Sequence, residues 1–145
     1  MPGDLKKLHD EHVHAMTSVW VLLDPRSETY KELQSKDYLV GDTHAYDVTS
    51  PAGRDAYWDP LPSKLLKQGW DAFWLDSCEP EEYWPHVGNA ILYNKHLAIG
   101  NGATYTNIYP LLQNMGVQDH WKETRQDKRV VLLTRSAFLG QQRRM

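Results

Sequence analysis

The sequence predicts an α/β fold in which helices cover a parallel sheet. Three short apolar runs have the length and composition of buried strands, at residues 15–23, 71–76 and 129–134. Helix-like stretches lie before and between them, and strands that alternate with helices are typical of β-α units. The runs are continuously apolar rather than alternating, as in parallel strands that are covered on both faces.

The first two helical stretches flank the first strand. In residues 4–12, Leu5 and Leu8 lie on one side among charged residues, a pattern typical of an amphipathic helix. Residues 25–36 follow the first strand directly and are also expected to be helical.

The third helical stretch has clear boundaries. It is expected to begin at Ser50-Pro51, because a serine hydroxyl can cap the first turn and proline fits within it. Gly69 is a natural stop. Pro60 and Pro62 are expected to kink or break the helix in between.

A final helix is expected within residues 104–126, interrupted near Pro110 and Gly116. The preceding stretch, residues 77–102, is long and lacks periodicity, and loops of that size in compact domains are usually functional. At its end the sequence NGATY, residues 101–105, lacks the glycine pattern of phosphate-binding loops and predicts a turn.

The composition is that of one globular domain without a nucleic-acid or membrane partner. The chain has 145 residues, of which 41% are hydrophobic and 24% charged, and its net charge is −3 with the basic residues scattered. No apolar stretch approaches the roughly 20 residues of a membrane helix, and the N-terminus lacks an apolar signal region. The compartment and the oligomeric state stay open.

Aromatic residues are the unusual part of this composition. Six tryptophans and eight tyrosines stand against two phenylalanines. Rings with a polar group suit a site in which one side is packed and the other meets a sugar. They are also ordinary core residues, so the composition permits a carbohydrate ligand without requiring one.

Polar residues mark the ends of all three predicted strands. The first run ends at Asp24, the second at Asp76 and the third at Thr134-Arg135-Ser136. Barrels and open sheets of the α/β class keep their active sites at the carboxyl ends of parallel strands. Strands also end in polar residues without any function, so the pattern indicates a candidate site and no more.

Asp76 lies between Trp74 and Trp84 and has two possible roles. It could be the carboxylate nucleophile of a glycosidase, acting on a sugar that the aromatic rings hold. It could instead cap a loop by accepting backbone hydrogen bonds. Three further acids follow, most of which are expected to face solvent: Glu79, Glu81 and Glu82.

Histidines and the single cysteine raise two other possibilities. His9, His12 and His14 could bind the metal of a metal-dependent hydrolase, but they straddle a helix end and a strand start and need not converge. Cys78 excludes an internal disulfide, and it would have to meet His86 in space to form a nucleophilic pair. We expect neither a metal site nor a cofactor.

Several longer motifs carry a resemblance to a known family. GWDAFWLDSCEPE at 69–81 resembles the nucleophile segment of glycoside hydrolase family 31, the retaining α-glucosidase and α-xylosidase family. LLTRSAFLGQQR at 132–143 resembles its next barrel strand and the loop that follows. Further matches occur in the same order at 8–20, 46–58 and 107–121. The details are most similar to the bacterial α-xylosidase-like branch.

The resemblance implies roles for three residues. In that family the aspartate of the W-x-D motif is the nucleophile, which falls on Asp76. Trp74 would line the sugar-binding subsite, and Arg135, from an R-S-x-F motif, would contact the sugar. The segment Ser77-Cys78-Glu79 replaces the family's usual Met-Asn-Glu, which puts the substrate preference in doubt rather than the role of Asp76.

The resemblance covers the middle of the family's barrel, about its third to fifth β/α units. A complete (β/α)8 TIM barrel needs about 250 residues, so residues 1–145 are expected to be a fragment of one catalytic barrel domain. A retaining glycosidase needs a second carboxyl group about 5–5.5 Å from its nucleophile, and the family's acid/base aspartate is expected beyond Met145.

These expectations together describe a parent enzyme and a fragment of it. The parent would hydrolyse terminal α-linked xylosyl or glucosyl residues of an oligosaccharide with retention, whereas this chain alone would be inactive. The alternative is a non-catalytic carbohydrate-binding α/β domain, in which the same rings stack on sugar without chemistry.

Overall fold

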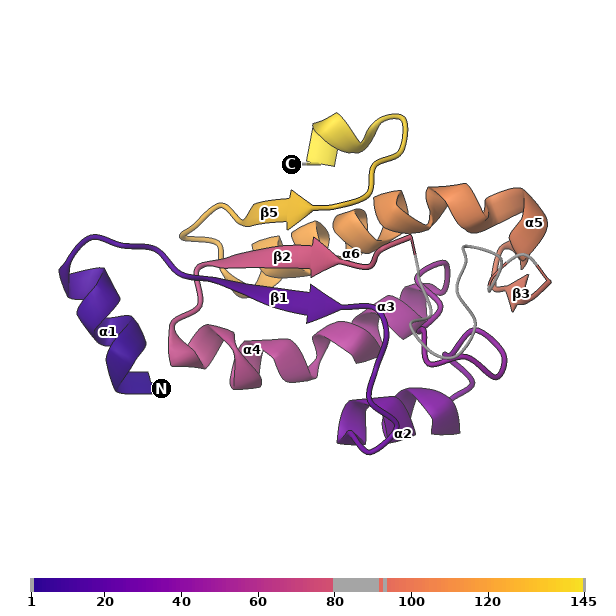
Figure 1. Ribbon diagram of the computed structural model, residues 1–145, viewed down its shortest axis with the longest axis horizontal. Coiled ribbons are helices and arrows are strands. Elements are labelled where there is room, and N and C mark those ends of the chain that lie inside the picture. Colours follow the sequence, from indigo (N-terminus) through magenta and orange to yellow (C-terminus); the bar gives the residue numbers. More distant parts are fainter. Residues whose placement is uncertain (1, 80–91, 93, 145) are drawn as a thin grey trace.

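The computed structural model describes residues 2–79, 92 and 94–144. Its centre is a parallel sheet of three strands, in the order β1 (Met16–Trp20), β2 (Ala72–Asp76) and β5 (Val131–Thr134) (Figure 1). An antiparallel pair, β3 (His96–Leu97) and β4 (Gly100–Asn101), lies beyond the carboxyl ends of these strands. The three predicted strands and their parallel arrangement are confirmed.

Helices precede and connect the strands. α1 (Pro2–Asp10) lies before β1, and the chain between β1 and β2 forms α2 (Glu28–Ser35), α3 (Pro51–Trp58), α4 (Pro60–Lys64) and the 3-10 turn η1 (Leu66–Gln68). Between β4 and β5 lie α5 (Gly102–Tyr105), η3 (Thr106–Ile108) and α6 (Tyr109–Thr124), and η4 (Gln141–Arg144) follows β5. No helix in the described ranges is both long and apolar enough to span a bilayer.

The first strand is shorter than its apolar run. It leaves the sheet after Trp20, and Leu22 forms an isolated antiparallel bridge with Ala45. Leu23 donates its backbone N–H to the carbonyl of His44 at 3.0 Å. Both leucines still pack against the core, so the sequence remains apolar after the strand has ended.

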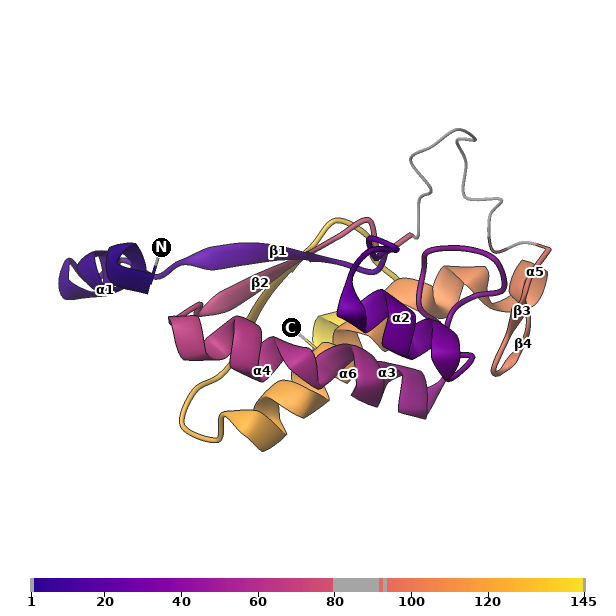
Figure 2. The same cartoon turned by 90° about the horizontal axis from the view of Figure 1, so that it is seen from below.

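The described helices that pack on the sheet cover one of its faces. Figure 2 shows α2, α3, α4 and α6 together on the same side. Phe73 of β2 is fully buried there, and its ring meets Trp58 and Trp121 edge-on, with centroids 6.1 and 5.6 Å apart. This cluster joins the middle strand to α3 and α6.

The opposite face of the sheet carries apolar side chains that are 37–59% exposed, and these are Met16, Trp20, Trp74, Val131 and Leu133. The expectation that helices or strands cover both faces is therefore wrong for the described part of the chain. Successive side chains of a strand point to opposite faces. Because both faces are apolar, the runs look continuous in the sequence, as they do when the second face lines a barrel interior.

The boundaries of α3, α4 and η1 follow the local signals of the sequence. Ser50 caps α3 by accepting from the Gly53 N–H at 3.1 Å, Asp59 separates α3 from α4, and Gly69 ends η1 with φ of 104°. The segment 101–105 is not a simple turn. The side chain of Asn101 caps the short helix α5.

The predicted interruption of the last helix at Gly116 is wrong, because α6 runs unbroken from Tyr109 to Thr124. Pro110 lies in its first turn, where a missing N–H costs nothing. Gly116 is used for close packing. A Cβ added there would lie 2.6 Å from Cδ of Arg54, whose guanidinium donates to the Val48 carbonyl.

Replacing Gly116 by alanine is expected to lower the free energy of unfolding by about 1–3 kcal/mol, because the new methyl displaces Arg54. Helix propensity alone would raise it by about 1 kcal/mol. Gly3→Ala is the matched control, since no atom lies within 4 Å of the added Cβ. Urea unfolding of both variants measures the difference, and a stabilised Gly116→Ala variant would show that the α3–α6 contact is loose.

Candidate functional site

Asp76 is the last residue of the middle strand, at the end of the sheet where all three parallel strands terminate. Trp20 is its register partner on β1, and Thr134, at the end of β5, pairs with the preceding Leu75. The carboxyl ends of the strands therefore meet around Asp76, as predicted. Asp76 is 9% exposed, so its carboxylate has little access to bulk water although it lies at the carboxyl end of the sheet.

A sharp turn directly after Asp76 sets the direction of its side chain. Ser77 has φ of +52°, a left-handed conformation that is uncommon for residues other than glycine. Its N–H donates to Oδ1 of Asp76 at 2.9 Å, and the Cys78 thiol lies 3.6 Å from the Asp76 carbonyl. Strained backbone of this kind is enriched at functional sites.

Arg135 lies between two carboxylates. It follows β5 and donates from Nε and Nη2 to the two oxygens of Glu79, both at 3.0 Å. The same Nε lies 3.5 Å from Oδ1 of Asp76. Residues that the sequence separates by 56 positions, Glu79 and Arg135, thus form one group with the strand-end aspartate.

Two tryptophans lie near Asp76 on the face of the sheet that no described helix covers, called the open face below. Trp74 is two residues earlier on the same strand, so it shares the face of Asp76, and it is 41% exposed. Trp20, 37% exposed, is the register partner of Asp76 on β1, and its indole N–H donates to Ser18. Trp20 could not be recognised from the sequence, because its proximity to Asp76 depends on the register between β1 and β2.

The sequence of residues 2–145 matches the family model described as the glycosyl hydrolases family 31 TIM-barrel domain. The chain belongs to glycosyl hydrolase family 31. An α-xylosidase from Saccharolobus solfataricus is 33% identical over 143 residues, which are 98% of this chain and 19% of that protein. The fragment of a family 31 barrel predicted from the motifs is confirmed.

Solved structures of the family agree with the fold. A family 31 α-xylosidase from Xanthomonas citri superposes with a TM-score of 0.82 and 30% identity, over 99% of this chain and 17% of the other. A family 31 α-xylosidase from a soil metagenome, complexed with xylose, gives a TM-score of 0.82 at 26% identity over 98% and 22% of the two chains. The chain thus spans about a fifth of these relatives, and its three strands are part of a TIM barrel.

Barrel membership explains the one-sided cover of the sheet. In a closed (β/α)8 barrel, helices lie outside and alternate side chains of each strand fill the interior. The face with Trp20, Trp74 and Leu133 corresponds to that interior, and the face with Phe73 corresponds to the helical layer. Asp76 and Arg135 lie at the carboxyl end, where TIM barrels hold their active sites.

Asp24, which was predicted to end the first strand, has a different setting. It lies four residues beyond the end of β1 and forms a forked ion pair with Arg26, with Oδ2 2.6 Å from Nη2. Hydrogen bonds from the Arg26 side chain and backbone lower the pKa of Asp24 to about 2. Its described polar contacts are local, and the structure does not bring it to Arg135.

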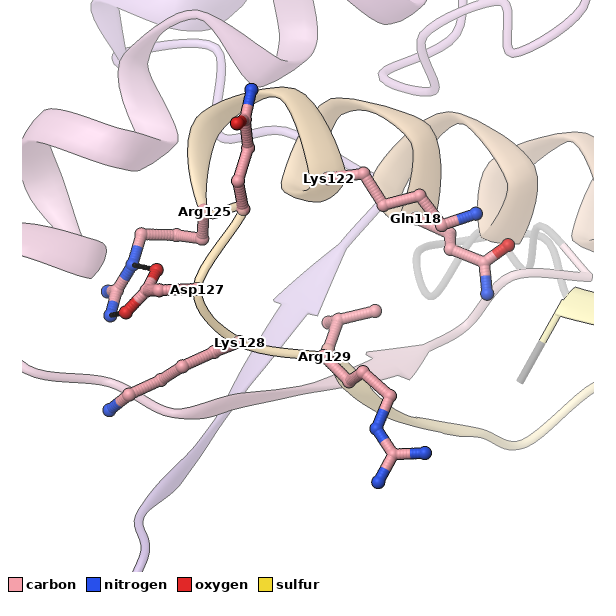
Figure 3. A pocket seen from close by; sticks show the side chains of 8 residues that line it. Gln118, Lys122, Arg125, Asp127, Lys128 and Arg129 are labelled. Atoms are coloured by element: carbon pink, nitrogen blue, oxygen red, sulfur yellow. Dashed lines mark hydrogen bonds and ion pairs between the residues drawn. The ribbon is translucent and has the colours of Figure 1, made fainter.

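A cavity of about 230 Å³ lies beside Glu79, where Thr106, Ser136 and Phe138 line it. A larger cavity of about 450 Å³ lies at the other end of β5, around the end of α6 (Figure 3). Lys122, Lys128, Arg129 and an Arg125–Asp127 ion pair surround it. Cations near a helix carboxyl terminus stabilise the helix, which accounts for this basic group without a ligand.

The histidine motif also lies at the amino end of the strands. Nε2 of His9 is 2.8 Å and Nδ1 of His14 is 3.6 Å from the two oxygens of Asp71, which precedes β2. His12 has φ of +61° in the intervening turn. Among the described residues, no group of three histidine, cysteine, aspartate or glutamate side chains could hold a metal ion.

The Cys78 thiol is fully buried behind Asp76. Burial, followed by the nearby charges of Glu79 and Asp76, raises its pKa to about 12. His86, its possible partner in a nucleophilic pair, lies outside the described residues, as do Trp84, Glu81 and Glu82. A protonated, buried thiol is a poor nucleophile.

We expect iodoacetamide to alkylate Cys78 at least about a hundredfold more slowly in the native chain at pH 8 than in guanidinium chloride. The native thiol reacts more slowly because burial raises its pKa. The unfolded thiol ionises near its ordinary value of 9.0, whereas the native thiol stays protonated until the pH approaches about 12. Intact mass measured over time gives both rates, and rapid native alkylation would place the thiol at the surface.

Proposed function

We propose that this chain is part of a retaining α-glycosidase and that Asp76 is its nucleophile. The observation that supports this best is the position of Asp76, buried at the carboxyl end of the middle strand within a segment that matches family 31. Arg135 Nε lies 3.5 Å from Oδ1 of Asp76, and the exposed rings of Trp20 and Trp74 lie beside Asp76 on the open face of the sheet.

The proposed reaction has two displacements. An oxygen of Asp76 attacks the anomeric carbon while the bond from that carbon to the leaving oxygen breaks, which gives a covalent glycosyl ester. In the second step water gives a proton to the second carboxyl group, which now acts as a base, and attacks the same carbon from the opposite side. This releases the Asp76 carboxylate and yields a sugar of unchanged configuration. Trp74 would support the sugar ring, and Arg135 would donate hydrogen bonds to its hydroxyl groups.

The leaving oxygen needs a proton from a second carboxyl group. Glu79 contacts the same arginine as Asp76, but Arg135 occupies both of its oxygens. It is therefore poorly placed to act as the acid. We propose that the acid/base residue comes from another segment of a single catalytic barrel domain, that residues 1–145 form one part of this domain, and that they are inactive alone.

The similar proteins support one class of substrate. The relatives at 33% and 30% identity are both α-xylosidases, so we propose a terminal α-linked xylosyl or glucosyl residue of an oligosaccharide. Xylose lacks the hydroxymethyl group of glucose. Side chains that sense this difference would come partly from barrel strands outside the 145 residues.

The test is hydrolysis of aryl α-xylosides and α-glucosides by the complete protein that contains this segment. Proton NMR in the first minutes should show the α-anomer of the released sugar, because two inversions restore the configuration. A β-anomer formed first would contradict the mechanism. Saturable sugar binding without turnover by that protein would instead support a carbohydrate-binding domain that uses the exposed rings of Trp20 and Trp74.

A further inference from the structure

The contact between Glu79 and Arg135 has a geometry that restricts the arginine. Two parallel N–H···O bonds of 3.0 Å connect the guanidinium fork to both carboxylate oxygens. A forked pair of this kind fixes the plane of the guanidinium as well as its distance. The side chains of Glu79 and Arg135 are 25% and 36% exposed, so the pair lies at the mouth of the site, not in the core.

The local backbone places Glu79 for this contact. The left-handed turn at Ser77 reverses the chain directly after Asp76, and Cys78 is anchored in the core. Glu79 follows immediately and meets Arg135, which comes from the neighbouring strand β5. The carboxylates of Asp76 and Glu79 therefore face one guanidinium from the same strand end.

The guanidinium is not shared equally between these carboxylates. Glu79 receives Nε and Nη2 at hydrogen-bond distance, whereas Asp76 has one contact of 3.5 Å, longer than an ordinary charged hydrogen bond. Among the described residues, the other carboxylate in contact with Arg135 is that of Asp76. A forked pair with Arg135 would occupy both oxygens of Asp76 and block their attack on a sugar.

We propose that Glu79 is a positioning residue, which holds Arg135 beside Asp76 and prevents the guanidinium from closing onto the nucleophile. This inference rests on the proposed role of Asp76. Glu79 acts through Arg135, so its effect on Asp76 requires the arginine. A purely structural role of the ion pair would instead lower the thermal unfolding midpoint together with the rate.

A double-mutant cycle in the complete protein tests the dependence. The probe is a 5-fluoro-α-xylosyl fluoride, whose fluoride leaves without a proton, so labelling reports on Asp76 and not on the acid. The second-order rate constant of inactivation, measured by intact mass, should fall by about tenfold or more in Glu79→Gln. In an Arg135→Ala background, the same change should alter it by less than about twofold.

Two controls exclude a folding effect. Glu123→Gln removes the charge of an exposed glutamate near the end of α6 and should leave inactivation unchanged. Thermal unfolding of each variant should occur at the wild-type midpoint, and Glu79→Asp, which keeps the charge on a shorter side chain, should restore part of the rate. An equal loss from Glu79→Gln in both backgrounds would overturn the proposal.

A crystal structure of the Glu79→Gln variant separates this proposal from the proposed function. We expect the Arg135 guanidinium to move to within about 3.0 Å of Asp76. If the wild-type protein is not labelled at all, the nucleophile assignment fails, while a moved guanidinium would still support the positioning role. An Arg135 that keeps its place beside the substituted glutamine, without approaching Asp76, would overturn that role even if labelling succeeds.

Discussion

Replacing Asp76 by alanine is expected to reduce glycoside hydrolysis by the complete protein by a factor on the order of 10⁴ to 10⁶, the range seen when a covalent nucleophile is removed. Two other carboxylates that follow the strands are already engaged, because Glu79 is held by Arg135 and Asp24 by Arg26. Steady-state rates on an aryl α-xyloside measure the effect. The Michaelis constant should change far less than the turnover number, since attack occurs after binding.

Asp24→Ala is the matched control for this prediction. It removes an aspartate that follows β1, is exposed and is paired locally with Arg26. The turnover of that variant should stay within about threefold of the wild type. If Asp76→Ala retains most of the activity, or if Asp24→Ala lowers the turnover as much as Asp76→Ala does, then the active site would lie elsewhere at the carboxyl end of the sheet.

Replacing Phe73 by alanine is expected to lower the free energy of unfolding by about 3–5 kcal/mol. Its ring is fully buried between Trp58 and Trp121, so its removal leaves a cavity at the junction of β2, α3 and α6. Since single domains have about 5–15 kcal/mol of stability in total, this loss could prevent folding. Urea unfolding followed by tryptophan fluorescence measures it.

Phe138→Ala provides the comparison, because the chain has two phenylalanines and this one is 37% exposed after β5. Its replacement should cost less than about 1 kcal/mol. Similar losses for both variants would mean that the ring of Phe73 is not the centre of the helical layer.

Local signals were enough to predict the three strands of the parallel sheet and several helix boundaries. The strand ending at Asp76, the cap at Ser50, the break between α3 and α4 and the stop at Gly69 all depend on a few neighbouring residues, and the structure has each of them. Gly116 was misinterpreted because its role depends on Arg54, which lies on another helix. Glycine is unfavourable inside a helix, but at this position it leaves the space that Arg54 occupies.

The composition of the site was harder to predict than its location. Asp76, Trp74 and Arg135 were identified from motifs, and the structure places all three around one strand end. Trp20 was missed because only the β1–β2 register brings it beside Asp76. The bond between Glu79 and Arg135 spans two strands, and no spacing within the sequence encodes it.

The open face shows a second limit of reading strands from hydrophobicity. A run such as residues 129–134 has the same composition whether helices or other strands cover its second face. Leu133, 52% exposed, matches a barrel interior as well as it matches a layered sheet. Family membership decided between the two architectures.

The most direct test of the account is to trap the nucleophile. The complete protein is incubated with a 5-fluoro-α-xylosyl or 5-fluoro-α-glucosyl fluoride, digested with pepsin and analysed by tandem mass spectrometry. We predict one added fluorosugar, located on Asp76 and absent in Asp76→Ala. A sugar on any other carboxylate, or steady turnover of these fluorides by the Asp76→Ala variant, would contradict the assignment of Asp76 as the nucleophile.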